Sequence, residues 1–130
     1  MDGASGIDAE RAQRWLDAYV AAWRSYDRDL IGALFSDAAR YRYHPADEWI
    51  RGREAIVDSW FDEPDEPGSY DAAYEPAAID GRVVVATGIS TYTNPDGSVK
   101  AVYDNCFVMR FDAEGRCEEL TEWFVERPAE

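Results

Sequence analysis

The chain has few of the residues that bind metals or form disulfides. Its 130 residues include one histidine, His44, and two cysteines, Cys106 and Cys117. A structural zinc site needs paired C-x-x-C or H-x-x-x-H ligands, which this sequence lacks, so we expect no metal. Isolated cysteines without an export signal are more often small buried hydrophobes than disulfide partners, and we expect both to be reduced.

Basic residues and long apolar runs are also scarce. The sequence has 13 Lys and Arg against 27 Asp and Glu, a formal net charge of −14. Because phosphate recognition requires clustered basic side chains, neither nucleic acid nor an anionic membrane surface is an expected partner. The longest apolar runs, such as residues 83–86, are far shorter than the roughly 18 residues of a membrane-spanning helix. Residues 1–6 show no secretory signal, so we expect a cytoplasmic protein.

Motifs for cofactor and nucleotide chemistry are missing too. We find no G-x-S-x-G elbow, no P-loop and no dinucleotide fingerprint. Serine hydrolysis, nucleotide hydrolysis and nicotinamide chemistry therefore have no support, and we expect no cofactor. The length favours a single domain over residues 1–130, with an ordered core at about 7–127.

The first half of the chain is expected to be helical. Asp8 is a suitable N-cap, and Ile7 and Ala12 are spaced for a hydrophobic staple. Apolar residues then recur at helical spacing along one stripe: Trp15, Leu16, Tyr19, Trp23 and Tyr26. A corner at 26–29 leads to a second short helix that ends near Ser36. A third short helix is predicted by a pairwise apolar pattern: Ile56, Val57, Trp60 and Phe61.

Strands dominate the rest. Residues 39–43 alternate and are aromatic, which predicts a strand that ends at His44, before Pro45. Residues 62–71 hold five acids, two prolines and a glycine, a composition typical of a mobile loop that could act as a lid. Turn signals then separate four long predicted strands, at 70–79, 82–93, 99–111 and 116–127. Helices before an antiparallel sheet predict an α+β domain, with the aromatic stripe of the first helix packed into the concave face.

Five segments carry a resemblance to a known family: YVAAW (19–23), LFSDA (34–38), YHP (43–45), RGREAI (51–56) and GRCEELTEW (115–123). In this order of elements the chain resembles the nuclear transport factor 2-like superfamily. It is most similar to the branch of SnoaL-like polyketide cyclases and ketosteroid isomerases. The resemblance implies a cone-shaped, cystatin-like α+β fold, in which N-terminal helices pack in a curved antiparallel sheet that opens to an apolar pocket. It also implies a homodimer through the outer face of the sheet.

His44 is the first candidate for chemistry. An unperturbed imidazole has a pKa of about 6.5, close to neutral pH. In the ketosteroid isomerase branch an Asp-Pro pair stands near the end of this strand and the Asp is the general base, so the resemblance carries that role to His44 beside Pro45. The alternative is a loop histidine held by packing or solvent.

Asn105 is the second candidate. Alternation puts Tyr103, Asn105 and Phe107 on one face of their strand, and the cost of burying Arg110 on the other face predicts that the first set lines the pocket. Asn105 would then hold a substrate carbonyl through its amide. The isomerase family has a protonated Asp at the position aligned with Phe107, and its absence here argues against steroid isomerase activity.

Glu122 is the third candidate. It shares one face of the last strand with Leu120 and Phe124. The resemblance turns Glu122 inward, where desolvation would raise its pKa and make it an acid or base paired with His44 or Asn105. The alternative is a solvated face, because three further glutamates lie on this strand.

Aromatic residues are candidates for the pocket wall, where they would stack on a flat ligand. They are Tyr19, Trp23, Tyr43, Trp60, Tyr103, Phe107 and Phe124. The alternative is that these rings only build the core. The sequence has five Trp and eight Tyr. Each of these residues needs a hydrogen-bond partner when it is buried, and a cavity that holds a ligand or water would supply some of the partners.

Two functional hypotheses follow. The first is a cofactor-free isomerase or cyclase that acts on a small apolar or aromatic carbonyl compound. In it His44 moves a proton, while Asn105, Tyr19 or Glu122 stabilises the enolate. The second is a non-catalytic ligand-binding or dimerisation domain of the same fold. It is favoured because Phe107 stands where the isomerase family has its acid.

Overall fold

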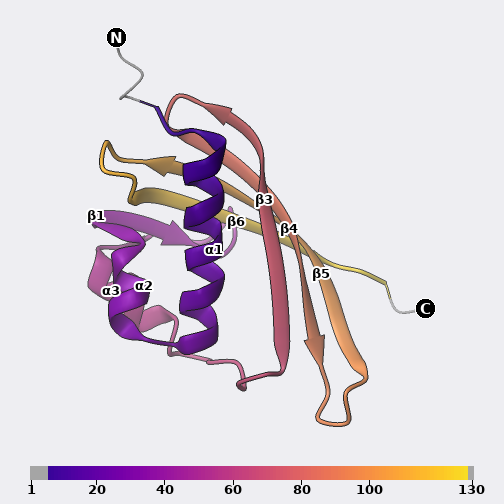
Figure 1. The fold of residues 1–130 in the computed structure, drawn as a ribbon. Coiled ribbons are helices and arrows are strands. Elements are labelled where there is room, and N and C mark those ends of the chain that lie inside the picture. The colour runs from indigo at the N-terminus through magenta and orange to yellow at the C-terminus, as the bar shows by residue number, and fades with distance from the viewer. Residues whose placement is uncertain (1–5, 129–130) are drawn as a thin grey trace.

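The computed structural model of the chain describes residues 6–128. The helices are α1 (Ala9–Ser25), α2 (Arg28–Ala33) and α3 (Arg53–Ser59). The strands are β1 (Phe35–Arg42), β2 (Ile50–Arg51), β3 (Tyr70–Asp80), β4 (Val83–Thr93), β5 (Val99–Phe111) and β6 (Cys117–Glu126). These strands form one sheet in the order β2-β1-β6-β5-β4-β3, and α1 lies across one of its faces (Figure 1).

Local signals set the ends of α1 and the start of α2. The carboxylate of Asp8 accepts a hydrogen bond from the backbone N–H of Arg11 at 2.8 Å, as expected of an N-cap. Tyr26 ends α1 in the left-handed conformation, with φ of 48°. Asp27 then caps α2 through the N–H groups of Asp29 and Leu30 at 2.9 and 3.2 Å. The predicted corner at 26–29 is confirmed.

The second helix is shorter than predicted. We expected it to end near Ser36, but α2 ends at Ala33 and Phe35 begins β1. Phe35 pairs with Cys117 of β6, and the N–H of Cys117 donates to the carbonyl of Leu34 at 2.9 Å. The prediction was wrong because a strand more than 80 residues away takes up these backbone groups, which helical spacing cannot reveal.

The sheet combines a predicted meander with an unexpected parallel pair. Strands β3 to β6 are antiparallel neighbours, and their bounds lie within one residue of those predicted. By contrast, β1 pairs with β6 in parallel, with Tyr41 beside Leu120. Only β2 pairs with β1 on its other side. The parallel pair places the end of β1 next to the middle of β6, which determines the site described below.

One face of the sheet holds the core. Across β4, β5 and β6, the neighbours Ala86, Phe107 and Glu122 form one inward row. Gly88, Asn105 and Phe124 form the next. Gly88 faces Tyr74 of β3, and a Cβ at this position would lie 2.3 Å from the Tyr74 ring. The glycine therefore leaves the space in which the Tyr74 ring packs over the sheet.

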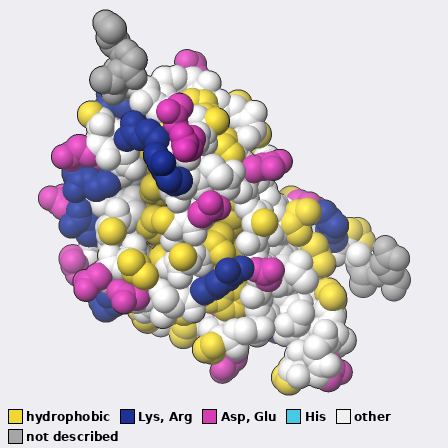
Figure 2. Space-filling model, viewed as in Figure 1, with side chains coloured by type: hydrophobic (Ala, Val, Ile, Leu, Met, Phe, Trp, Pro, Cys, Tyr) yellow, Lys and Arg dark blue, Asp and Glu magenta, His cyan; other side chains and the backbone are white. Residues whose placement is uncertain are grey.

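The surface of the described residues is mixed in character. Figure 2 shows acidic and basic side chains around one face and hydrophobic side chains gathered near its centre. Between residues 6 and 128 the structure contains no helix that is long and apolar enough to cross a membrane. Both cysteines are free: Cys106 is half-buried and Cys117 is buried.

Candidate functional site

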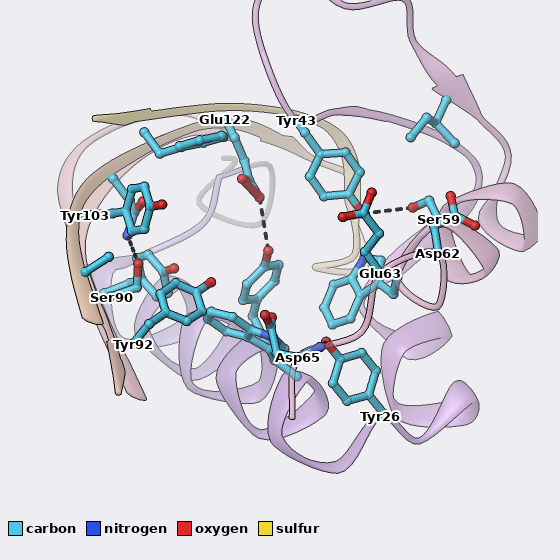
Figure 3. Close-up of a pocket in the computed structure, with 18 of the residues that line it drawn as sticks. Tyr26, Tyr43, Ser59, Asp62, Glu63, Asp65, Ser90, Tyr92, Tyr103 and Glu122 are labelled. Atoms are coloured by element: carbon cyan, nitrogen blue, oxygen red, sulfur yellow. Dashed lines mark hydrogen bonds between the residues drawn. The ribbon is translucent and has the colours of Figure 1, made fainter. Parts of the chain in front are cut away.

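A cavity of about 800 Å³ opens between α1, the concave face of the sheet and the segment that joins α3 to β3 (Figure 3). Such a volume is typical of sites for small molecules. Its wall is formed by Tyr19, Trp23, Tyr26, Tyr43, Ile50, Ser59, Trp60, Asp62, Glu63, Asp65, Tyr74, Ser90, Tyr92, Lys100, Ala101, Tyr103, Asn105, Glu122 and Phe124.

Glu122 is the carboxyl group in the interior of this wall. Its Oε1 accepts hydrogen bonds from the hydroxyls of Tyr19, at 3.2 Å, and Tyr41. The two hydroxyls are themselves 2.8 Å apart. Tyr19 comes from α1 and Tyr41 from β1, so three elements meet at one oxygen atom. Figure 3 shows the Glu122 carboxylate directed into the space enclosed by the aromatic rings.

The environment of Glu122 suits proton transfer near neutral pH. Burial raises the pKa of its carboxyl to about 7, although the two tyrosine hydrogen bonds act in the opposite direction. Burial and the nearby Glu122 charge raise the pKa of both phenols well above the usual value. Tyr19 and Tyr41 therefore stay protonated and act as hydrogen-bond donors to the Glu122 carboxyl.

The second carboxylate oxygen of Glu122 is available to a ligand. Both tyrosine hydrogen bonds reach Oε1, and no donor among residues 6–128 reaches Oε2. Oε2 is also accessible. Among the described residues, the side-chain atoms that are both enclosed and without a hydrogen-bond partner belong to Trp60 and Arg116, and Oε2 is not one of them. Glu122 thus has one oxygen held by the protein and one open to the cavity.

Asn105 lies one row further along the same face. Its amide nitrogen donates to Ser90 Oγ at 3.0 Å, and the Ser90 side chain is buried. Asn105 pairs with Phe124 on β6, two residues from Glu122. In a sheet such diagonal neighbours are roughly 7–8 Å apart, so one small molecule can reach both side chains.

Tyrosines give the wall many hydroxyl groups. The hydroxyl of Tyr43 is 2.8 Å from Ser59 Oγ, and that of Tyr26 accepts from the Asp65 N–H at 2.9 Å. Among the described residues, the hydroxyls of Tyr74, Tyr92 and Tyr103 have no hydrogen-bond partner, and none of them is enclosed. A bound molecule or water would be their natural partner.

The structure places most of the sequence-predicted residues on this wall. Asn105 and Glu122 line it, as do the aromatic residues Tyr19, Trp23, Tyr43, Trp60, Tyr103 and Phe124. Phe107 does not, because it is buried beneath the ring of Tyr74, with the two rings stacked at 4.8 Å between centroids.

His44 does not share the cavity with Asn105 and Glu122. Tyr43 and Phe124 are among the described residues that line the wall, whereas His44, two residues beyond the end of β1, is not. The imidazole packs against Phe124, with ring centroids 4.9 Å apart. His44 therefore contacts a residue of the wall without being a lining residue itself.

Several site residues were not singled out from the sequence. Residues 62–71 were identified only as a possible lid, but Asp62, Glu63 and Asp65 belong to the wall. Tyr74 and Tyr92 are inward residues of β3 and β4, and strand alternation could have assigned them to the same face as Asn105. Within residues 6–128 no group of three or more His, Cys, Asp or Glu side chains is arranged to hold a metal ion.

Fold and site together define a class: an α+β cone whose curved sheet and first helix enclose an aromatic cavity, with the Glu122 carboxyl inside. Residues 16–120 match the family model of the SnoaL-like domain. The chain belongs to this family.

Solved structures share the fold. An NTF-2 like protein of unknown function from Burkholderia xenovorans LB400 has a TM-score of 0.70 and 19% identity, over 96% of this chain and 90% of that chain. SalBIII, an epoxide hydrolase/cyclase-like enzyme in pyran ring formation in salinomycin, has a TM-score of 0.66 and 18% identity, over 91% and 93% of the two chains.

Curated relatives match a shorter stretch. The RNA polymerase sigma factor SigG of the ECF type, from Mycobacterium tuberculosis strains CDC 1551 and H37Rv, is 38% identical over 56 residues. That stretch covers 43% of this chain and only 15% of the sigma factor.

Proposed function

We propose that this protein is a cofactor-free isomerase or cyclase that acts on a small, flat and largely apolar carbonyl compound. The observation that carries the proposal is the Glu122 carboxyl, which has one oxygen open to an aromatic cavity and a pKa of about 7. A general base is most effective when its pKa lies near the working pH. The same group can then return the proton as an acid.

The reaction needs only groups of this chain. The ionised Oε2 of Glu122 takes a proton from the carbon next to the carbonyl, and the C–H electron pair moves to form an enolate. Free phenol hydroxyls and the Asn105 amide stabilise the negative oxygen. Where the carbonyl is conjugated with a C=C bond, the dienolate takes the proton back from Glu122 at its γ-carbon; where a second carbonyl is within reach, the enolate carbon forms a C–C bond to it and the resulting alkoxide takes the proton from Glu122. Tyr19 and Tyr41 hold the carboxyl in place.

Exchange of deuterium into a ketone tests the proposal. In D₂O at pD 7.5, NMR would follow loss of the α-proton signals of 2-tetralone and 1-indanone with the wild type, Glu122→Gln and His44→Gln. We expect enzyme-dependent exchange that falls by about a hundredfold or more in Glu122→Gln, in keeping with the 10²–10⁴ typical of acid–base groups. His44→Gln is the matched control and should keep most of the rate.

Either of two results would contradict this proposal. Exchange that is no faster with the wild type than with Glu122→Gln would remove the catalytic role of the carboxyl. Loss of exchange in His44→Gln alone would restore the role first predicted for His44. Circular dichroism of each variant should match the wild type, so that a lost fold is not mistaken for a lost base.

A second candidate function is a ligand-binding regulatory domain. It is favoured by the match to part of a sigma factor, a protein of transcription rather than of metabolism. A binding domain would hold 2-tetralone without exchanging its protons. Line broadening or a shift of the bound ketone signals without exchange would therefore favour this second function.

We also propose a cytoplasmic homodimer that forms through the outer face of the sheet. On that face Ile89 and Val125 flank Asp104, and their side chains are 44% and 67% exposed. Trp123 lies beside them, 40% exposed. Exposed apolar side chains that cluster on one sheet face are typical of an interface. Native mass spectrometry at micromolar concentration would show the dimer, and a monomer there would exclude it.

A further inference from the structure

The charges around the cavity are unevenly distributed. Asp62, Glu63 and Asp65 lie together in the segment between α3 and β3, and Glu122 lies inside. Figure 3 shows Glu63 and Asp65 beside the open space and on the same side of it as Tyr26. Among residues 6–128, Lys100 is the one basic residue on the wall, an exposed side chain at the start of β5. The charged groups that a ligand meets as it enters the cavity are therefore mainly carboxylates.

Asp65 is held in place over the aromatic wall. Its Oδ2 accepts a hydrogen bond from the indole N–H of Trp23 at 3.1 Å, and its backbone N–H donates to the Tyr26 hydroxyl at 2.9 Å. Both partners belong to the end of α1. The carboxylate is therefore fixed at the cavity, unlike the freely solvated acids that are common in a chain of this net charge.

The field of Asp65 extends over the neighbouring rings. Burial, followed by the negative charge of Asp65, raises the pKa of the Tyr92 phenol. Tyr92 lines the cavity, and the Trp23 ring lies 6.3 Å from it in an edge arrangement. The Tyr70 ring is stacked on the Trp23 ring, with 4.4 Å between the ring centroids. Carboxylates and aromatic rings therefore surround the same part of the pocket.

Both kinds of group attract cations. The face of an aromatic ring has a negative potential that binds ammonium groups, most strongly when water is excluded. A nearby carboxylate adds Coulomb attraction, which is larger in a partly desolvated cavity than in water. The same charges repel an anionic ligand. Acidic side chains alone would not make such a site, but here they border a cavity with an aromatic wall.

We propose that the ligand of this cavity carries a positively charged amine or quaternary ammonium group, which lies between Asp65, Glu63 and the rings of Trp23, Tyr26 and Tyr92. This inference deepens the proposed function, because it makes the substrate a cationic carbonyl compound. The ammonium group would lie at the mouth and the carbonyl group deeper, towards Glu122.

Three probes of similar shape test the charge. Phenacyltrimethylammonium is a cationic ketone, 3,3-dimethyl-1-phenylbutan-1-one is its uncharged carbon isostere, and phenacylsulfonate is an anion. Dissociation constants would be measured by calorimetry or NMR titration at 20 and 300 mM salt. We expect the cation to bind about tenfold more tightly than the isostere, and the anion to bind most weakly. Salt should weaken only the binding of the cation appreciably.

Variants of the wall test whether the cation binds beside Asp65 and Glu63. Asp65→Asn keeps an oxygen for the Trp23 N–H but removes the charge, and together with Glu63→Gln it should weaken cation binding about tenfold while the isostere changes less than twofold. Glu10→Gln is the matched control, because it removes an acid roughly 20 Å away at the other end of α1. The control should leave all three affinities unchanged.

The inference is overturned if the isostere or the anion binds as tightly as the cation, or if none of the three binds at millimolar concentration. It is also overturned if Glu10→Gln weakens the cation as much as the pocket variants do. These results concern binding alone. Proton exchange in 2-tetralone tests Glu122 separately, so the failure of one proposal can be told from the failure of the other.

Discussion

Replacing Glu122 with glutamine should change how the stability of the protein depends on pH. Glutamine has the shape of the protonated glutamate but cannot ionise. The folded protein raises the pKa of Glu122 from 4.5 to about 7, because burial disfavours the charged form. The folded state therefore binds this proton more strongly than the unfolded state does.

The sign and size of the effect follow from this difference. The stabilising contribution of protonated Glu122 is fully present below pH 4.5 and is lost as the pH rises to about 7. Each pKa unit is worth about 1.36 kcal/mol, so the full loss is about 3 kcal/mol. About 2.5 kcal/mol of it should fall between pH 5 and pH 8, and water in the cavity makes this an upper value.

Urea unfolding followed by tryptophan fluorescence would measure the effect. The quantity to compare is the free energy of unfolding of the wild type minus that of Glu122→Gln, at half-unit steps from pH 5 to pH 8. This difference removes the contributions of the many acids that both proteins share. It should become more negative by about 2 kcal/mol as the pH rises.

A second variant gives an internal check. Tyr41→Phe removes a hydrogen bond that lowers the pKa of Glu122, so the pH at which stability is lost should move upwards. A difference between wild type and Glu122→Gln that stays flat from pH 5 to pH 8 would refute the reasoning. It would mean that the carboxyl has an ordinary pKa and is accessible to water.

Three further predictions concern the fold that supports the site. Gly88→Ala should lower the free energy of unfolding by about 1–3 kcal/mol and displace Tyr74, because the new Cβ would lie 2.3 Å from that ring; urea unfolding measures the loss, and an unchanged midpoint would contradict it. Asp8→Ala should cost about 1 kcal/mol in the same assay through loss of the N-cap, and no change would show that the cap contributes nothing. In the native protein a thiol reagent should spare buried Cys117, whose pKa is raised by burial, and label it only after unfolding in urea, whereas rapid labelling of Cys117 in the native protein would oppose this burial.

Local patterns were sufficient for much of the fold. The aromatic stripe predicted α1, and alternation with turn signals predicted β3 to β6 to within one residue. These elements have strong periodicity and clear end signals, which neighbouring residues supply. Phe35 shows where such reasoning fails, since it fits the helical pattern of Ile31 and Leu34 but joins a strand of the sheet.

Sequence patterns predicted part of the candidate site in the same way. Alternation on β5 predicted that Asn105 faces inward, and the resemblance to the SnoaL-like branch turned Glu122 to the same side. The chemistry assigned to the lone histidine rested on residue type and strand position. Position along the chain does not show which side chain reaches the cavity, and His44 packs instead against Phe124.

The sequence by itself determined α1 and the strands β3 to β6, because their periodicity and end signals lie in neighbouring residues, and its motifs pointed to the family. Only the tertiary structure decided which groups meet. The parallel pairing of β1 with β6 brings Tyr41 to Glu122, and the packing of α1 adds Tyr19. Burial by these distant segments raises the pKa of Glu122, and burial depends on the whole fold rather than on the residues beside it.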